Sequence, residues 1–355
     1  MGGKKYKGEQ LSLNNSQIIH YTLSSIFHVL LTGGVGSRLW PLSRQSRPKQ
    51  YLEIFSQHSL FELAVQRNAS FVNDLIVVGN RGNSNLSEAA LSKLGISDYV
   101  NIVEATPRNT APAIAFAAFA AQPEDILLVT PADHIIKEGR EYSDAVQKAI
   151  KLAQDNNIVT FGIEPTRPET GYGYIEFEGE EVMSFREKPN EDTAKDFLKR
   201  GSFLWNSGMF CFKAGIFLEE LQKYSPEVYK QSLAAWNKAS TGELERESSL
   251  DIPSISVDYA VMEKSERIKV VQSHFEWSDM GSFEAVYDYL KEQGQPVDKF
   301  GNMQIGSTKH TCFVGLTNCI LVSTDDAILV LSKEASQNVK ELYQELEKNN
   351  MSLVQ

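Results

Sequence analysis

The sequence predicts an α/β protein: a Rossmann-like, mixed but mostly parallel sheet flanked by helices, followed by a small β-rich C-terminal domain. Two observations predict this fold class. Apolar runs typical of buried strands alternate with helix-like segments from residue 27 to residue 163. After Gly294 the composition changes to short β-rich runs separated by turn signals. On a mostly parallel sheet, ligands bind beyond the carboxyl ends of the strands.

The first half of the chain contains the clearest strand–helix repeats. Strands are predicted at short apolar runs, and helices where apolar residues recur at helical spacing or alanine dominates. The predicted strands cover residues 27–31, 74–79, 100–105, 125–134 and 158–163. The predicted helices cover residues 59–70, 83–95, 109–122 and 142–156. Conspicuous polar residues follow three of the strand ends, at 33–38, 104–110 and 131–134.

From about residue 170 the pattern changes. Strands are predicted in YGYIEFEG, EVMSFREKP and SGMFCFKA, with a helix at 193–200 and further helices around 215–238. A polar loop is expected over 240–255, a helical piece over 257–265, and a strand end running into a helix over 274–290. The C-terminal part closes with an amphipathic helix in VKELYQELEKN.

Three parts of the chain are therefore expected. Residues 1–25 form a loosely ordered N-terminal extension, because its apolar run is broken by polar residues and lacks the cleavage site of a signal peptide. Residues 26–292 form the main domain and residues 293–355 the small β-rich domain.

Charge and cysteine content exclude several classes of protein. The formal net charge is −11, so the surface as a whole repels nucleic acid and anionic membranes, and no apolar run is long enough to span a bilayer. The three cysteines, Cys211, Cys312 and Cys319, have no metal-type spacing, and their apolar neighbours predict reduced, buried thiols in a cytosolic protein. The six histidines match no zinc motif. An anionic ligand would thus need a local basic site.

Such a site is predicted directly after the first strand, where the sequence reads LLTGGVGSRLWPLSRQSRPKQYL from Leu30 to Leu52. A glycine-rich turn exposes backbone N–H groups to an anion because no side chain blocks its approach. The stretch is neither a Walker loop nor a clean dinucleotide fingerprint, so a simple tight turn is the competing interpretation. The nearby cations Arg38 and Lys49 favour phosphate binding, because a structural turn does not need them.

The stretch GGVGSRLWPLSR…RPKQYL resembles the signature of sugar-1-phosphate nucleotidyltransferases, in particular mannose-1-phosphate guanylyltransferases. The resemblance continues in order through EATPRNTAPAI, PADH, TGYGYIE, FREKP, WNSGMF, SVDYAVMEK and WSDMGSF, and covers roughly residues 27–290. Each block alone is a weak signal, whereas the ordered set is specific. One departure is Thr32, where the family more often has alanine or serine. The resemblance implies the nucleotidyltransferase, GT-A-like version of the Rossmann-like fold.

The resemblance also implies a nucleotide site. Arg38 and Lys49 would hold the β- and γ-phosphates, and the loop from Glu104 to Thr110 would lie against the base. Residue types and spacing alone do not distinguish guanine from adenine, and Asn109 or Thr110 also suits a helix cap. The expected nucleotide-binding residues are Leu31, Gly33, Gly34, Gly36, Ser37, Arg38, Lys49, Glu104, Pro107, Arg108, Asn109, Thr110 and Asp133.

By the same resemblance, Asp133 and Asp279 would converge on one Mg²⁺. Magnesium commonly takes one or two carboxylates together with phosphate oxygens, although a strand-end aspartate is often only a cap or turn residue. The expected sugar-phosphate site comprises Tyr172, Gly173, Glu187, Lys188 and Asn206. The expected catalytic residues are Arg38, Lys49, Asp133, Lys188 and Asp279.

The implied reaction joins GTP and α-D-mannose 1-phosphate to give GDP-mannose and pyrophosphate. An in-line attack without a covalent intermediate agrees with the absence of a recognisable Ser/His or Cys/His arrangement. Another sugar 1-phosphate, another NTP, a non-catalytic sensor and a Rossmann dehydrogenase are the alternatives. An isomerase domain, such as longer family members carry, is not expected, and the β-rich tail resembles a short-type module that often helps to build a homodimer. A cytoplasmic enzyme without nucleic-acid or membrane partners is expected.

Overall fold

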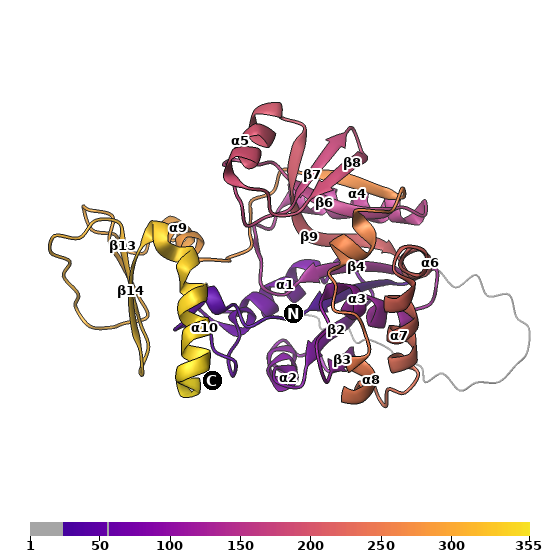
Figure 1. Ribbon diagram of the computed structural model, residues 1–355, viewed down its shortest axis with the longest axis horizontal. Helices are drawn as coiled ribbons and strands as arrows, with labels where there is room; N and C mark the ends of the chain where they lie inside the picture. The colour runs from indigo at the N-terminus through magenta and orange to yellow at the C-terminus, as the bar shows by residue number, and fades with distance from the viewer. Residues whose placement is uncertain (1–23, 55–56) are drawn as a thin grey trace, which may run out of the picture.

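The computed structural model describes residues 24–54 and 57–355, and its large domain is built on a nine-stranded mixed sheet (Figure 1). Nearly all of the predicted N-terminal extension lies outside the described residues. The order of the strands across the sheet is β3 (Val100–Glu104), β2 (Asp74–Asn80), β1 (Ile26–Leu31), β4 (Ile126–Pro131), β9 (Phe203–Lys213), β6 (Ile158–Ile163), β10 (Ile268–Ser273), β8 (Glu181–Arg186) and β7 (Tyr174–Glu178).

The half of the sheet that contains β1 is parallel and positions the loops of interest. Strand β1 pairs in parallel with β2 and β4, and β2 pairs in parallel with β3. Leu31, the last residue of β1, is in register with Val78 and Pro131. The loops that follow these strands therefore begin at the same edge of the sheet, as the sequence predicts.

Helices cover both faces of the parallel half because its strands are apolar on both sides. Val29, Ile76 and Val129 share one core cluster with α3 (Thr110–Phe119), α6 (Ala214–Tyr224) and α7 (Pro226–Trp236). On the other face, Leu30 and Val77 pack with α1 (Leu60–Asn68) and α2 (Ser84–Lys93). The same face, near β4 and β6, packs with α4 (Arg140–Gln154) and α5 (Glu191–Arg200). The predicted fold class is confirmed.

The C-terminal part forms a smaller unit beside the large domain (Figure 1). It contains a three-stranded sheet of β12 (Met303–Ile305), β13 (Cys319–Ser323) and β14 (Ile328–Ser332), together with α10 (Val339–Asn349). Its core includes Phe283 and Val286 of α9 (Phe283–Glu292), and also Leu39 and Trp40 from the segment after β1. One continuous core thus joins the two units.

Three local expectations differ from the structure. The expected loop at 240–255 contains a short helix, α8 (Arg246–Leu250), because Ser248 and Ser249 are buried and need a partner for their backbone groups. The expected strand at 125–134 ends at Pro131 and resumes as β5 (Ile135–Ile136), which pairs with β11 (Trp277–Ser278). Of the three thiols only Cys211 is buried, whereas Cys312 is exposed and Cys319 is partly exposed, in the C-terminal unit.

The expected helical piece at 257–265 is a single π-helical turn, Asp258–Met262, whose Ala260, Val261 and Met262 are buried. Among residues 24–54 and 57–355, no helix combines the length and the apolar character required to cross a bilayer.

Candidate active site

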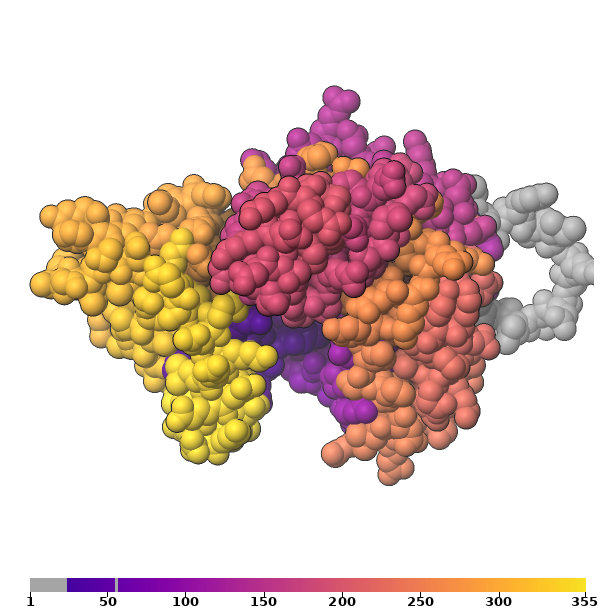
Figure 2. Space-filling model, turned by 45° about the horizontal axis from the view of Figure 1, so that its top comes forward, coloured from indigo at the N-terminus to yellow at the C-terminus, as the bar shows by residue number. Residues whose placement is uncertain are grey.

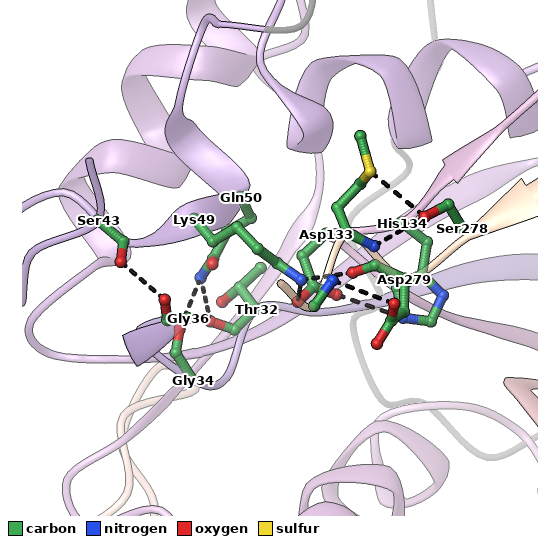
Figure 3. Close-up of polar contacts among 12 residues, drawn as sticks. Thr32, Gly34, Gly36, Ser43, Lys49, Gln50, Asp133, His134, Ser278 and Asp279 are labelled. Carbon is green, nitrogen blue, oxygen red and sulfur yellow. Dashed lines mark hydrogen bonds and ion pairs between the residues drawn. The ribbon is translucent and has the colours of Figure 1, made fainter. Parts of the chain in front are cut away.

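The loop that follows β1 is held by hydrogen bonds to its carbonyl groups. Gln50 donates its side-chain amide to the carbonyl oxygens of Thr32 (2.7 Å) and Gly34 (3.4 Å), and the Ser43 hydroxyl donates to the carbonyl of Gly36 (2.7 Å; Figure 3). None of the N–H groups of residues 33–36 donates a hydrogen bond within the described part of the chain. The loop therefore offers donors and no side chains, which suits an anion.

Position 36 must be glycine because the Lys49 side chain lies directly against its backbone. Its φ of 76° is a conformation that favours glycine, and a Cβ built at this position would lie 2.5 Å from the Cβ of Lys49. The Lys49 backbone N–H in turn donates to the carbonyl of Val35 (3.0 Å). The glycine thus allows a cationic side chain to pass directly beneath the loop.

Lys49 is buried and lies between two aspartates that are distant in sequence (Figure 3). Its ammonium group is 2.7 Å from Oδ2 of Asp133 and donates to the backbone carbonyl of Asp279 at 2.6 Å. Burial alone would raise the pKa of Asp133, but the charge of Lys49 and its hydrogen bond to this carboxylate outweigh burial and lower the pKa. Asp133 is therefore a carboxylate at neutral pH.

His134 takes a definite tautomer. The indole N–H of Trp277 lies 3.2 Å from Nδ1 of His134, and an indole can only donate, so Nδ1 accepts. Burial lowers the pKa of His134, with Asp133 opposing the shift, so the neutral ring carries its proton on Nε2. Nε2 lies 3.6 Å from Oδ1 of Asp133 and is thus oriented toward that carboxylate.

Asp279 is oriented by two donors. The Tyr172 hydroxyl and the Gly281 backbone N–H both donate to its Oδ1, at 2.8 and 3.0 Å. Burial and the neighbouring Asp279 raise the pKa of Tyr172 well above its ordinary value, so the phenol stays protonated and donates. Tyr172 is fixed by edge contacts with the rings of Trp205 and Trp277. No described residue donates to Oδ2 of Asp279.

A second group of polar residues lies where β7 and β9 meet the cavity. A Cβ at Gly173 would lie 2.6 Å from Oε2 of Glu187, so glycine allows this carboxylate to approach the backbone. Asn206 donates its amide to Oδ1 of Asp258 at 2.9 Å. Burial and the charge of Glu187 raise the pKa of Asp258. Lys188 is mostly exposed and pairs with Glu187.

The opposite end of the cavity is closed by the start of α3. Asn109 caps this helix by accepting from Thr110 N–H (2.8 Å), and the Thr110 hydroxyl accepts from Val257 N–H (2.9 Å). Glu104, at the end of β3, is 6% exposed, and its Oε1 has no hydrogen-bond partner among the described residues. Burial raises the pKa of Glu104 to about 7, against a smaller opposing effect of the Arg108 backbone. A buried, unsatisfied carboxylate in a cavity indicates a ligand that brings donors.

These residues line two adjoining cavities. The first has a volume of about 440 Å³ and lies between Glu104 at one end and Glu187 at the other. The second has a volume of about 600 Å³ and extends from the glycine loop and Arg38 toward α10. Gly34, Asp133, His134 and Asp279 line both cavities. The two aspartates and Lys49 therefore lie where two ligands, or two parts of one ligand, would meet.

Comparisons with known proteins agree with this geometry. Residues 27–295 match the family model described as nucleotidyl transferase. The chain belongs to the nucleotidyl transferase family. Residues 296–346 match the model described as MannoseP isomerase/GMP-like beta-helix domain, which corresponds to the small C-terminal unit.

The relatives of this nucleotidyl transferase are similar over most of their length. The chain is 38% identical to "Mannose-1-phosphate guanylyltransferase" of Escherichia coli over 347 residues, which cover 90% of this chain and 74% of the relative. It is 38% identical to "Xanthan biosynthesis protein XanB" of Xanthomonas campestris pv. campestris over 344 residues, covering 91% and 74%. The structure of "mannose-1-phosphate geranyltransferase" from Thermus thermophilus superposes with a TM-score of 0.78 at 30% identity, covering 91% and 99%.

The structure brings together most residues that the sequence predicts for a nucleotidyl transferase site. Those that line the first cavity are Leu31, Gly33, Gly34, Glu104, Pro107, Asn109, Thr110, Asp133, Tyr172, Gly173, Glu187, Lys188, Asn206 and Asp279. Gly36, Ser37, Arg38 and Lys49 line the second. Arg108 lines neither, because its side chain is turned away and donates to the carbonyl of Ile252 at 2.7 Å. Its position does not support the predicted contact with the base.

Several residues of the two cavities are not predicted from the sequence. His134, Asp258 and Trp277 stand inside quoted motifs but had no predicted role. Lys340 and Gln344, which line the second cavity, lie in the C-terminal helix about 290 residues after Lys49. Their i, i+4 spacing places them on one helix face, but a sequence pattern does not say what that face meets.

Proposed function

We propose that this enzyme transfers a guanylyl group from GTP to α-D-mannose 1-phosphate, giving GDP-mannose and pyrophosphate. The observation that carries the proposal is the cluster at the junction of the two cavities. There a glycine loop, a buried lysine and two carboxylates from distant segments face the same space. The family uses nucleotides and sugar phosphates as substrates, and relatives named mannose-1-phosphate guanylyltransferase support guanylyl transfer to mannose 1-phosphate.

The choice of guanine is supported by Glu104. Guanine presents two neighbouring donors, N1–H and the exocyclic N2–H₂, which match the two oxygens of a carboxylate. Adenine presents no such pair, because its N1 is an acceptor. The buried and unpartnered Oε1 of Glu104 would be satisfied by guanine and left unsatisfied by adenine. Leu31, Pro107, Asn109 and Thr110 would surround the base.

The phosphates would lie along the glycine loop. Their negative charge would be met by the free N–H groups of residues 33–36, by Lys49 and by Arg38. Arg38 forms no salt bridge with any other described residue, so its guanidinium is available to a phosphate. We therefore assign Arg38, Lys49, Gly36 and Ser37 to the triphosphate.

The sugar phosphate would occupy the Glu187 end of the first cavity. Glu187 and Asn206 would supply acceptors and a donor for sugar hydroxyls, Gly173 would leave room for the ring, and Lys188 would meet the phosphate. Asp258, which Asn206 contacts, adds a further acceptor at the same end. Tyr172 lies between this region and Asp279.

The nucleotidyl transferase family generally uses a divalent metal ion, and we propose that here it is Mg²⁺, held by Asp133 and Asp279. The donor set fits a hard divalent cation, because Asp133 is ionised and Oδ2 of Asp279 receives no hydrogen bond from the described residues. When bound, such an ion neutralises phosphate charge and polarises phosphoryl oxygens. In the described ranges 24–54 and 57–355, no group of three or more His, Cys, Asp or Glu side chains is arranged to hold a metal ion.

The chain's own residues would promote the reaction by positioning and charge neutralisation. A phosphate monoester is largely ionised near neutral pH, so the sugar phosphate can attack the α-phosphorus without a general base. His134 is not placed to act as a general base. Its Nε2 carries a proton directed to Asp133, and its Nδ1 accepts from the Trp277 indole, so neither ring nitrogen is free to accept a proton. Lys49 and Arg38 would stabilise the pyrophosphate as it leaves opposite the attacking oxygen.

A substrate panel tests the proposal. Pyrophosphate release is measured with GTP, ATP, UTP and dTTP, each with mannose 1-phosphate or glucose 1-phosphate, before and after chelation with EDTA and after restoration of Mg²⁺. We expect GTP with mannose 1-phosphate to be the preferred pair and EDTA to abolish turnover. Preference for another pair would retain the chemistry and change the substrates, which is the alternative function. No release from any pair would contradict the proposal.

We further propose that the enzyme is a cytoplasmic homodimer, in which residues 26–292 form the catalytic domain and residues 293–355 the small domain. The match of residues 296–346 to a beta-helix model supports a separate small unit. α9, the last helix of the proposed catalytic domain, packs with the C-terminal strands, so the two domains share a core. Light scattering coupled to gel filtration tests the dimer, since a mass near 40 kDa would indicate a monomer.

A further inference from the structure

The second cavity extends beyond the family's glycine loop to a helix of the other domain. One of its walls is the glycine loop with Arg38, and the facing wall is α10, which contributes Lys340, Tyr343, Gln344 and Glu347. Figure 2 shows a hollow between α10, in yellow, and the body of the protein, with indigo N-terminal segments at its floor. The hollow is thus closed on one side by the C-terminal domain.

Alpha-helical spacing explains why these four side chains share a wall. Positions 340, 343, 344 and 347 follow one another at i, i+3, i+4 and i+7, which is one face of a helix. Tyr343 anchors that face, because it is 5% exposed and belongs to the core that contains Leu39 and Trp40. Lys340 and Gln344 are exposed beside it.

The C-terminal segment is fixed to the phosphate loop region by several hydrogen bonds. The backbone N–H of Gln45 donates to the carbonyl of Val354 (2.8 Å), and the Trp40 indole donates to the carbonyl of Leu353 (2.7 Å). Arg44 forms a 2.6 Å ion pair with Asp326. These contacts hold α10 at a defined position relative to the loop, so its side chains are available to a ligand without a large rearrangement.

Charge and unsatisfied polarity indicate what the cavity binds. Arg38 and Lys340 line it, and neither forms a salt bridge with a described residue. The buried Tyr343 hydroxyl makes no hydrogen bond of ordinary geometry to described residues, although the Gln45 side chain is close enough to influence its pKa. The lining also contains three carboxylates, Asp133, Asp279 and Glu347. Lys49 pairs with Asp133, and Glu347 accepts a hydrogen bond from the Gln45 side chain at 3.3 Å. Arg38 and Lys340 are therefore the cations left for a multiply charged oxyanion, beside the aspartates proposed to hold the metal ion.

We propose that α10 completes the binding site for pyrophosphate, with Lys340 and Gln344 contacting the leaving group and the terminal phosphates of the nucleotide. The inference rests on the proposed nucleotidyl transfer, since that reaction supplies the polyphosphate. The C-terminal domain is thus part of the active site. Lys340 and Gln344 act on the release and rebinding of pyrophosphate, while base and sugar are recognised in the first cavity.

The test compares Lys340→Ala with Lys348→Ala, a matched control that removes the same charge from an exposed position of α10 outside the cavity. Pyrophosphorolysis of GDP-mannose is followed by formation of GTP. We expect Lys340→Ala to raise the KM for pyrophosphate about tenfold, the size of one charge-assisted hydrogen bond. The KM for GDP-mannose should be unchanged, and Lys340→Arg should restore much of the affinity. Equal KM values for pyrophosphate in Lys340→Ala and Lys348→Ala would overturn the proposal.

A binding measurement separates this proposal from the proposed function. Titration calorimetry with pyrophosphate, and with inorganic phosphate as a shorter anion, is performed on the full chain in the presence of Mg²⁺. Weaker binding of pyrophosphate to Lys340→Ala, but not to Lys348→Ala, supports the site even if the substrate panel shows no guanylyl transfer. Normal guanylyl transfer with equal pyrophosphate affinity in both variants refutes only the role of α10.

Discussion

Replacing Lys49 with methionine removes the charge at the junction of the two cavities and keeps most of the side-chain volume. Lys49 is 5% exposed, and its ammonium contacts the Asp133 carboxylate at 2.7 Å and the Asp279 carbonyl at 2.6 Å. The substitution leaves Asp133 without its main cation. Loss of one such preorganised charge costs about 3 kcal/mol in the transition state, so we expect kcat/KM to fall about a hundredfold or more.

Stability should also decrease, in a pH-dependent way. Because Lys49 helps to lower the pKa of folded Asp133, the pair stabilises the fold above the unfolded pKa of aspartate, near 4. That contribution disappears as pH falls through the folded pKa. The difference in free energy of unfolding between the wild-type protein and Lys49→Met should therefore be largest near neutral pH and shrink in acid, as measured by urea unfolding at several pH values.

The control is Lys213→Met, which removes a largely buried lysine that pairs with Glu124 at 2.9 Å, away from both cavities. This variant should lose stability but keep kcat/KM within about twofold of wild type, as expected for a residue outside the site. The assay is pyrophosphate release at saturating and limiting GTP, with circular dichroism to verify folding. If folded Lys49→Met has nearly wild-type kcat/KM, the assignment of Lys49 to the phosphates is wrong.

Three further substitutions or conditions test other parts of the site. Burial raises the pKa of Glu104 to about 7, and guanine is proposed to bind its carboxylate form, so the KM for GTP should rise as pH falls below 7. In steady-state kinetics, Glu104→Gln should flatten this pH profile and weaken the preference for GTP over ATP. Gly36→Ala should displace Lys49, because the alanine Cβ would lie 2.5 Å from the lysine Cβ. We expect at least a hundredfold loss of turnover together with a lower melting temperature. Unchanged kinetics would contradict the steric argument. Tyr172→Phe removes the 2.8 Å hydrogen bond to Asp279 and should lower kcat about tenfold with little change in stability; a variant with normal kcat would show that the orientation of Asp279 does not depend on this phenol.

Much of the site could be predicted because chemistry-bearing residues follow strand ends. Gly33 to Lys49 follow β1, the loop from Glu104 to Thr110 follows β3, and Asp133 follows β4. Parallel pairing brings these ends to one edge of the sheet, so local sequence is sufficient to predict their proximity. The direction of a long side chain is not encoded in this way, which is why Arg108 turns to Ile252 instead of lining the cavity.

The sequence by itself determined the alternation of strands and helices, the glycine loop with its cations, and the separate β-rich C-terminal part. These features depend on residue types within short windows, where periodicity and backbone freedom act locally. Only the tertiary structure decided that Lys49 lies between Asp133 and Asp279, that His134 directs its Nε2 proton to Asp133, and that α10 forms a wall of the second cavity. The contacts of Lys49 and of α10 join segments separated by about 80 to 290 residues, and they follow from how buried apolar faces pack together rather than from any local pattern.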